Sequence, residues 1–153
     1  MGDLKAVRRV RGASDYEQVG PGLWADLPAV LLVRDVPSEG RALVYEVDQG
    51  GDGRVHIKRV GMESLDGSRI TSADWRAANP FEVWETVGLQ LIKTAHPIDQ
   101  GTRYKPLGEE SVEVVANLRS RGPGNPATLQ AVADAYNAAT ALGIPASKHV
   151  QRV

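Results

Sequence analysis

The 153-residue chain contains no cysteine and few aromatic side chains. The absence of cysteine excludes disulfide bonds and thiolate metal ligands, and nothing in the composition indicates an oxidising compartment. Aromatic residues make up only 5% of the sequence, with a single Phe. An aliphatic core must therefore form around three large anchors, Trp24, Trp75 and Trp84.

Long apolar runs are also missing. The longest, Ala29 to Val33, is far shorter than the roughly 20 residues that a helix needs to cross a bilayer. The basic segment 1–14 has no apolar stretch behind it, so it does not have the form of a secretory signal. Hydrophobic residues still amount to 42%, which is enough for a folded core. We expect a cytoplasmic protein.

The three histidines do not form a metal-binding pattern. His56, His96 and His149 are far apart in the sequence, and none has another His or a carboxylate at metal-ligand spacing on a helix. His56 falls at an outward position of an expected strand, and His96 precedes a proline in an expected loop. We therefore expect both at the surface.

Glycine-rich segments also lack the residues that would give them a chemical role. The stretch 48–53 resembles a calcium loop, but Gly50 and Arg59 occupy ligand positions that require oxygen donors, which favours a hairpin turn. The sequence has neither a phosphate-binding glycine loop nor a Gly-x-Ser-x-Gly nucleophile turn. We therefore predict a binding protein rather than an enzyme, with no metal and no cofactor.

Charge is distributed unevenly along the chain, although the net charge is only −1. Residues 1–11 hold four basic groups and one acid (+3), residues 119–153 again four and one (+3), and residues 12–118 ten basic and seventeen acidic groups (−7). Basic ends on an acidic body suit contact with nucleic acid, while the alternative is that they only aid solubility. The candidate contact residues are Arg8, Arg9, Arg11, Arg119, Arg121, Lys148 and Arg152.

The first half of the chain has the pattern of a small β-sheet. The apolar run 29–33 is typical of a strand buried on both faces. In residues 42–47 the side chains of Leu43, Tyr45 and Val47 can share one face, and residues 55–58 alternate apolar and polar side chains. Because short turns connect these segments, we expect an antiparallel meander of three to four strands within about residues 28–70. Residues 1–20 are expected to be irregular or partly helical.

The second half has the pattern of helices. Thr71 and Asp74 form a capping pair, and Asn79-Pro80 starts a helix expected to reach about residue 93 or 94. Its apolar side would contain Phe81, Trp84, Val87 and Leu91. A loop at 96–108, a helix at 109–120 and a Gly-Pro linker at 121–125 follow.

Residues 126–153 are expected to form a helical hairpin. Its first helix would end at Gly143, and its apolar stripe would contain Leu129, Val132, Ala133, Tyr136 and Ala139. The predicted fold is thus α+β, with a β-meander of three to four strands followed by four to five helices. We expect one α+β domain over 1–121, with helices at about 72–121, and the hairpin after it.

The segment 129–153 resembles the opening of a helix-turn-helix region in a group of actinobacterial regulator-like proteins with a β-rich N-terminal part. The residues that carry the resemblance are Val132, Ala133, Tyr136 and Ala139 in the first helix, then Gly143, Pro145 and residues 147–150. The stretches 69–71, 75–76 and 79–80 are similar to the passage from sheet to helix in the same group.

The resemblance implies a DNA-associated regulatory protein. The recognition helix that reads bases should follow Val153, so any DNA contact by this chain would be made to phosphates. A plain helical hairpin packed on the body remains the alternative for residues 126–153. For the whole chain, the alternative is a protein–protein interaction module of phage or mobile-element origin, binding itself or another protein, with an unrecognised enzyme as a third reading.

Overall fold

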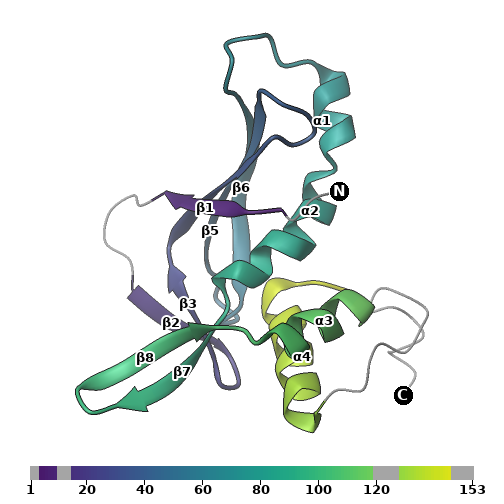
Figure 1. The fold of residues 1–153 in the computed structure, drawn as a ribbon. Helices are drawn as coiled ribbons and strands as arrows, with labels where there is room; N and C mark the ends of the chain where they lie inside the picture. Colours follow the sequence, from purple (N-terminus) through teal and green to yellow (C-terminus); the bar gives the residue numbers. More distant parts are fainter. Residues whose placement is uncertain (1–3, 10–14, 119–127, 146–153) are drawn as a thin grey trace.

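A computed structural model describes residues 4–9, 15–118 and 128–145. Within these ranges the chain forms eight strands in two four-stranded antiparallel sheets, four α-helices and one 3₁₀ helix (Figure 1). The α+β class therefore holds, but the single meander of three to four strands is wrong. No helix in this part of the chain is both long and apolar enough to cross a membrane.

The first sheet has the order β1-β4-β5-β6 and contains the strands that the sequence predicted, with β1 added at its edge. Its strands are β1 (Ala6–Arg9), β4 (Ala29–Arg34), β5 (Arg41–Gln49) and β6 (Val55–Ser64). β4 is buried on both faces, as predicted, since Ala29 to Val33 are all buried, and it pairs with β1 and β5 along its two edges. The predicted turn at 48–53 joins β5 to β6 and is confirmed.

The second sheet has the order β2-β3-β7-β8 and was not predicted. It consists of β2 (Asp15–Gly20), β3 (Leu23–Leu27), β7 (Lys93–Ile98) and β8 (Gly101–Pro106). Residues 1–20, expected to be irregular or helical, thus supply β1 and β2, and the expected loop at 96–108 lies mostly in two strands. Pro97 and Pro106 concealed β7 and β8, because proline is disfavoured inside a sheet but tolerated in strands with a free edge.

The first two α-helices and the 3₁₀ helix lie between β6 and β7 in the chain. α1 (Ser72–Ala78) begins with the predicted capping box, in which Thr71 and Asp74 exchange hydrogen bonds of 2.9 and 3.2 Å. α2 (Pro80–Val87) starts at the predicted proline but gives way to a 3₁₀ helix, η1 (Gly88–Leu91), before β7. The prediction of one helix to residue 93 or 94 is therefore wrong. Phe81, expected to face the core, is 64% exposed.

The last two helices pack against each other beside the second sheet. They are α3 (Glu109–Leu118) and α4 (Leu129–Leu142). Gly143 ends α4 in the left-handed conformation with φ of 69°, as the sequence predicted. Residues 146–153, where the second helix of the predicted hairpin would lie, are outside the described residues.

Of the predicted stripe, α4 buries Ala139 and half-buries Val132, while the other three residues are exposed. Its core face is made mainly of small side chains: Ala131, Ala135, Ala138, Ala139, Ala141 and Leu142. Leu129, by contrast, is 89% exposed, and Tyr136 is also exposed. Alanine side chains allow the helix to lie close to its neighbours, where many atoms come into van der Waals contact. Close packing of this kind explains why the alanine face is buried and the larger side chains of Leu129 and Tyr136 are not. The Trp84 indole N–H, which donates to the Leu142 carbonyl at 3.1 Å, fixes the end of α4 to α2.

Two polar side chains join the first sheet to the helices. Arg41, only 7% exposed, donates to Ser68 Oγ at 2.8 Å, to the Arg69 carbonyl at 2.7 Å and to Asp74 Oδ2 at 3.2 Å. The buried Tyr45 hydroxyl donates to the Pro80 carbonyl at 2.5 Å. These bonds fix the loop after β6 and the starts of α1 and α2 to β5.

Candidate nucleic-acid interface

Only part of the predicted basic contact set can be located. Arg8 lies in β1, where its guanidinium pairs with Asp26 at 2.6 Å and donates to the Pro28 carbonyl at 3.2 Å. Its charge is therefore compensated, and it links the two sheets instead of being available to a phosphate. For Arg9 only the backbone in β1 is described. Five further members lie outside the described residues: Arg11, Arg119, Arg121, Lys148 and Arg152.

The structure offers a different basic element, a ribbon formed by β7 and β8 (residues 93–106). β3 pairs with β7 only at Thr94 and Lys93, whereas the pairing of β7 with β8 continues to Ile98 and Gly101. Residues 95–104 consequently extend beyond the rest of the sheet as a two-stranded β-ribbon. Figure 1 shows this ribbon projecting away from the first sheet at the lower left.

The charge of the ribbon is opposite to that of the remaining body. Residues 93–106 contain Lys93, Arg103 and Lys105 against Asp99, a net +2 with neutral histidine. The rest of residues 12–118 contains seven basic and sixteen acidic groups, a net −9. The ribbon is thus a cationic projection on an acidic body. Summing the charge over 12–118 as one block concealed this feature, which a shorter window over the same sequence reveals.

Two of the ribbon's cations lie on one face and are not compensated. In the strand register His96 is opposite Arg103 and Thr94 is opposite Lys105, so alternation places Arg103 and Lys105 on the same face as His96. Both are exposed and make no hydrogen bond or ion pair with any residue that the structure describes. His96, whose Nε2 lies 3.0 Å from Thr94 Oγ1, is also exposed, as predicted.

Aromatic side chains on the opposite face hold the ribbon at its base. The Tyr104 ring stacks on Tyr16 of β2 with 3.7 Å between ring centroids and 7° between planes, and meets the Trp24 ring edge-on at 6.0 Å. Lys93, opposite Trp24 on the same face, is partly buried, and this burial lowers the pKa of its ammonium group. The contacts fix the direction in which the ribbon leaves the sheet.

His56, exposed as predicted, interacts with Asp52 in the β5–β6 turn, with 2.8 Å between Nε2 and Oδ1. The hydrogen bonds from Arg54 N–H and His56 lower the pKa of the Asp52 carboxyl. Among the described residues, no three His, Asp or Glu side chains come together as metal ligands would.

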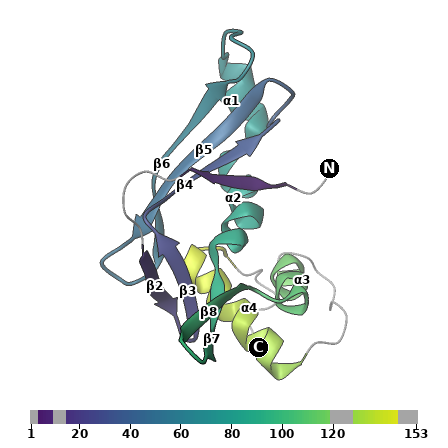
Figure 2. The same ribbon diagram turned by 60° about the vertical axis from the view of Figure 1, so that its left-hand side comes forward.

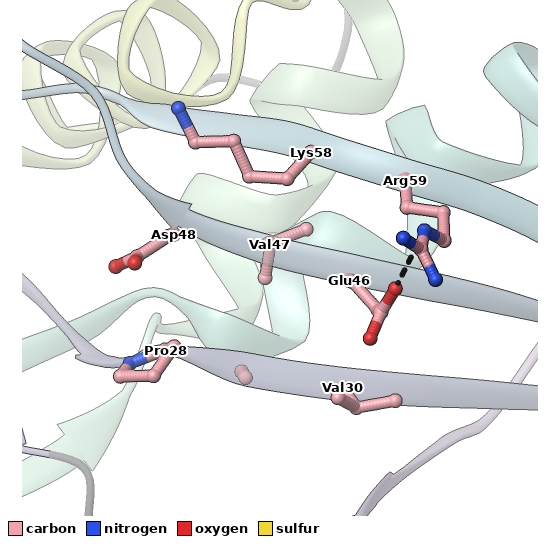
Figure 3. A pocket seen from close by; sticks show the side chains of 8 residues that line it. Pro28, Val30, Glu46, Val47, Asp48, Lys58 and Arg59 are labelled. Carbon is pink, nitrogen blue, oxygen red and sulfur yellow. Dashed lines mark ion pairs between the residues drawn. The ribbon is translucent and has the colours of Figure 1, made fainter. Parts of the chain in front are cut away.

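A shallow pocket of about 320 Å³ lies over β4, β5 and β6. One wall carries the ion pair between Arg59 Nε and Glu46 Oε2 at 3.2 Å, over apolar side chains that include Val30. Figure 3 shows that Lys58 and Asp48 extend away from this pair. The charged groups of the pocket therefore do not converge on a common point, as acid–base catalysis would require.

Comparisons with protein-family models, with curated proteins and with solved structures found no match for this chain.

Proposed function

We propose that this protein is a non-enzymatic, DNA-associated regulatory protein that contacts the DNA backbone through the β7–β8 ribbon. The observation that carries the proposal is that a projecting ribbon with a net charge of +2 lies on a body, the rest of residues 12–118, with a net charge of −9. A two-stranded ribbon fits the major groove of B-DNA, and uncompensated Arg and Lys side chains gain affinity by releasing counterions from phosphates. The resemblance of residues 129–153 to a helix-turn-helix region supports the same function. With this function we propose a cytoplasmic location.

The acidic body gives the contact its orientation. Negative charge on the remaining surface repels DNA, so only the ribbon side can approach closely. Arg103 lies in the distal part of the ribbon, and Lys105 nearer its base. Because these contacts are made to phosphates, they position the protein without reading sequence. Binding is therefore expected to be weakly sequence-dependent and steeply weakened by salt.

The test compares two double variants that remove the same charge from different places. Arg103→Ala with Lys105→Ala removes the ribbon cations, whereas Arg34→Ala with Arg76→Ala removes two exposed cations of the body. Affinity for a labelled 20-base-pair duplex is measured at several salt concentrations. The ribbon variant should lose about tenfold in affinity at low salt, and its log–log salt slope should fall by about 2.

The salt slope of the body variant should equal that of the unmodified protein, because the proposal gives Arg34 and Arg76 no contact with DNA. Equal losses in both double variants would show that net charge, and not the ribbon, determines binding. Absence of binding by the unmodified protein at low salt would remove the proposal.

A further inference from the structure

The end of the β7–β8 ribbon presents an exposed apolar side chain. Ile98 lies opposite Gly101 at the last pair of the ribbon, and residues 99–100 form the turn. Ile98 is 52% exposed, and Gly101 has no side chain that could cover it from across the pair. In Figures 1 and 2 this end of the ribbon lies on the opposite side of the molecule from α1. Ile98 is therefore open to a ligand that approaches the end of the ribbon.

Ile98 shares a face with the two uncompensated cations of the ribbon. Alternation along β7 places it on the same side as His96, and His96 lies opposite Arg103 in the register. From the base to the end, this face presents Lys105, then Arg103, then Ile98. At about 3.3 Å per residue, Arg103 lies about 7 Å from the last pair of the ribbon, and Lys105 about 13 Å.

This order of side chains fits the major groove of duplex DNA, which is about 8.5 Å deep. When the end of the ribbon reaches the floor of the groove, Arg103 lies near the level of the phosphates and Ile98 lies among the base edges. The other groups that base pairs present there are hydrogen-bond donors and acceptors, so the thymine C5-methyl group is the apolar one. Contact between Ile98 and this methyl group removes apolar surface of both from water.

Asp99, the one acid of the ribbon, favours the same approach. It is exposed in the turn next to Ile98. Phosphates would repel its carboxylate if the whole ribbon lay along the DNA backbone. At the floor of the major groove the carboxylate can instead accept a hydrogen bond from the amino group of adenine or cytosine. The charge pattern thus favours an approach with the turn toward the base edges.

We propose that Ile98 contacts thymine methyl groups in the major groove, while Arg103 and Lys105 contact the phosphates. This inference rests on the proposed function, to which it adds a groove and a preferred base. One methyl contact gives a modest preference for A·T pairs, which agrees with binding that depends weakly on sequence. Insertion of Ile98 between base steps from the minor groove, a second use of an exposed apolar side chain, would not involve the thymine methyl group.

Two 20-base-pair duplexes of the same alternating A·T sequence provide the probe. One contains thymine and the other deoxyuridine, which lacks only the C5-methyl group. We expect the unmodified protein to bind the thymine duplex about fourfold tighter, which is the change expected for one buried methyl group. Ile98→Ala should lower this ratio to about one. Ile70→Ala, at an exposed isoleucine outside the ribbon, is the matched control and should keep the ratio at about four.

Two outcomes would overturn the inference. The first is equal affinity of the unmodified protein for the thymine and deoxyuridine duplexes, which would also be the result of insertion from the minor groove. The second is a fourfold ratio that persists in Ile98→Ala, because the preference would then come from the shape of the duplex and not from Ile98. Circular dichroism confirms that both variants are folded, as expected for substitutions of exposed side chains.

The outcome is distinguishable from that of the test of the proposed function. Ile98→Ala keeps both ribbon cations, so its log–log salt slope should equal that of the unmodified protein. Suppose that removal of Arg103 and Lys105 weakens binding, but the unmodified protein does not distinguish thymine from uracil. The proposed function would then stand without the methyl contact. Absence of binding to either duplex at low salt would remove both proposals.

Discussion

The first sheet and the β7–β8 ribbon use charged side chains in opposite ways. In the first sheet the Arg41 guanidinium is buried and donates to acceptors in the loop after β6 and in α1, and Arg59 is paired with Glu46. In the ribbon Arg103 and Lys105 are exposed and have no partner among the described residues. The compensated charge of Arg41 holds the first sheet to the helices, and the uncompensated charges of Arg103 and Lys105 are available for a ligand.

Replacing Arg41 with Ala should have the largest effect on stability. The variant would leave Asp74, Ser68 and the Arg69 carbonyl without their shared donor, so the free energy of unfolding should fall by about 3 kcal/mol in urea titrations. Arg103→Ala is the matched control and should change it by less than about 0.5 kcal/mol. Equal losses of unfolding free energy in the two variants would show that the charges of Arg41 and Arg103 do not differ in their contribution to stability.

Tyr45→Phe should come second. The buried hydroxyl donates to the Pro80 carbonyl, so its removal leaves that acceptor unsatisfied and should cost about 2 kcal/mol. Tyr136→Phe, at an exposed position of α4, serves as control and should be neutral. The same urea titration measures both, and a neutral Tyr45→Phe would mean that water replaces the lost donor.

Tyr104→Ala should affect the ribbon more than the rest of the protein. Loss of the contacts with Tyr16 and Trp24 should cost about 1 kcal/mol and speed amide hydrogen exchange in residues 95–104. The first sheet should keep its exchange rates. Faster exchange throughout the molecule would show that these contacts stabilise the whole fold and not the ribbon in particular.

The smallest expected effect concerns acid stability. Hydrogen bonds from Ser68 and Ser64, with the charge of Arg41, lower the pKa of the Asp66 carboxyl to about 2. Because this folded-state pKa lies below the unfolded value, Asp66 stabilises the fold above about pH 4, and the contribution is lost as pH falls toward 2. Asp66→Asn should flatten the pH dependence of stability only in that window. An unchanged profile would contradict the assignment.

The predictable part of the fold was the part with strong local patterns. The apolar run of β4, the turn between β5 and β6, the Thr71–Asp74 capping box and the stop at Gly143 all follow from residue type and spacing. Each depends on contacts within a few residues, which a sequence displays directly.

The rest depended on contacts between distant segments. β2 pairs with β3 locally, but β7 joins them across some 70 residues, and nothing in its polar, proline-containing sequence indicates a strand. α4 is rich in alanine on several sides, so its buried face was decided by packing. The candidate interface was missed for a related reason, since the ribbon's exposed cations become a site only once β7 and β8 project together.

The central claim is that DNA contacts the ribbon, and a titration followed by nuclear magnetic resonance tests it most directly. The ¹⁵N-labelled protein would be titrated with a short DNA duplex at low salt, and the shifts of the backbone amides recorded. The account predicts shifts concentrated in residues 95–105, with few in β4 to β6. Shifts confined to the first sheet, or spread evenly over the molecule, would contradict it.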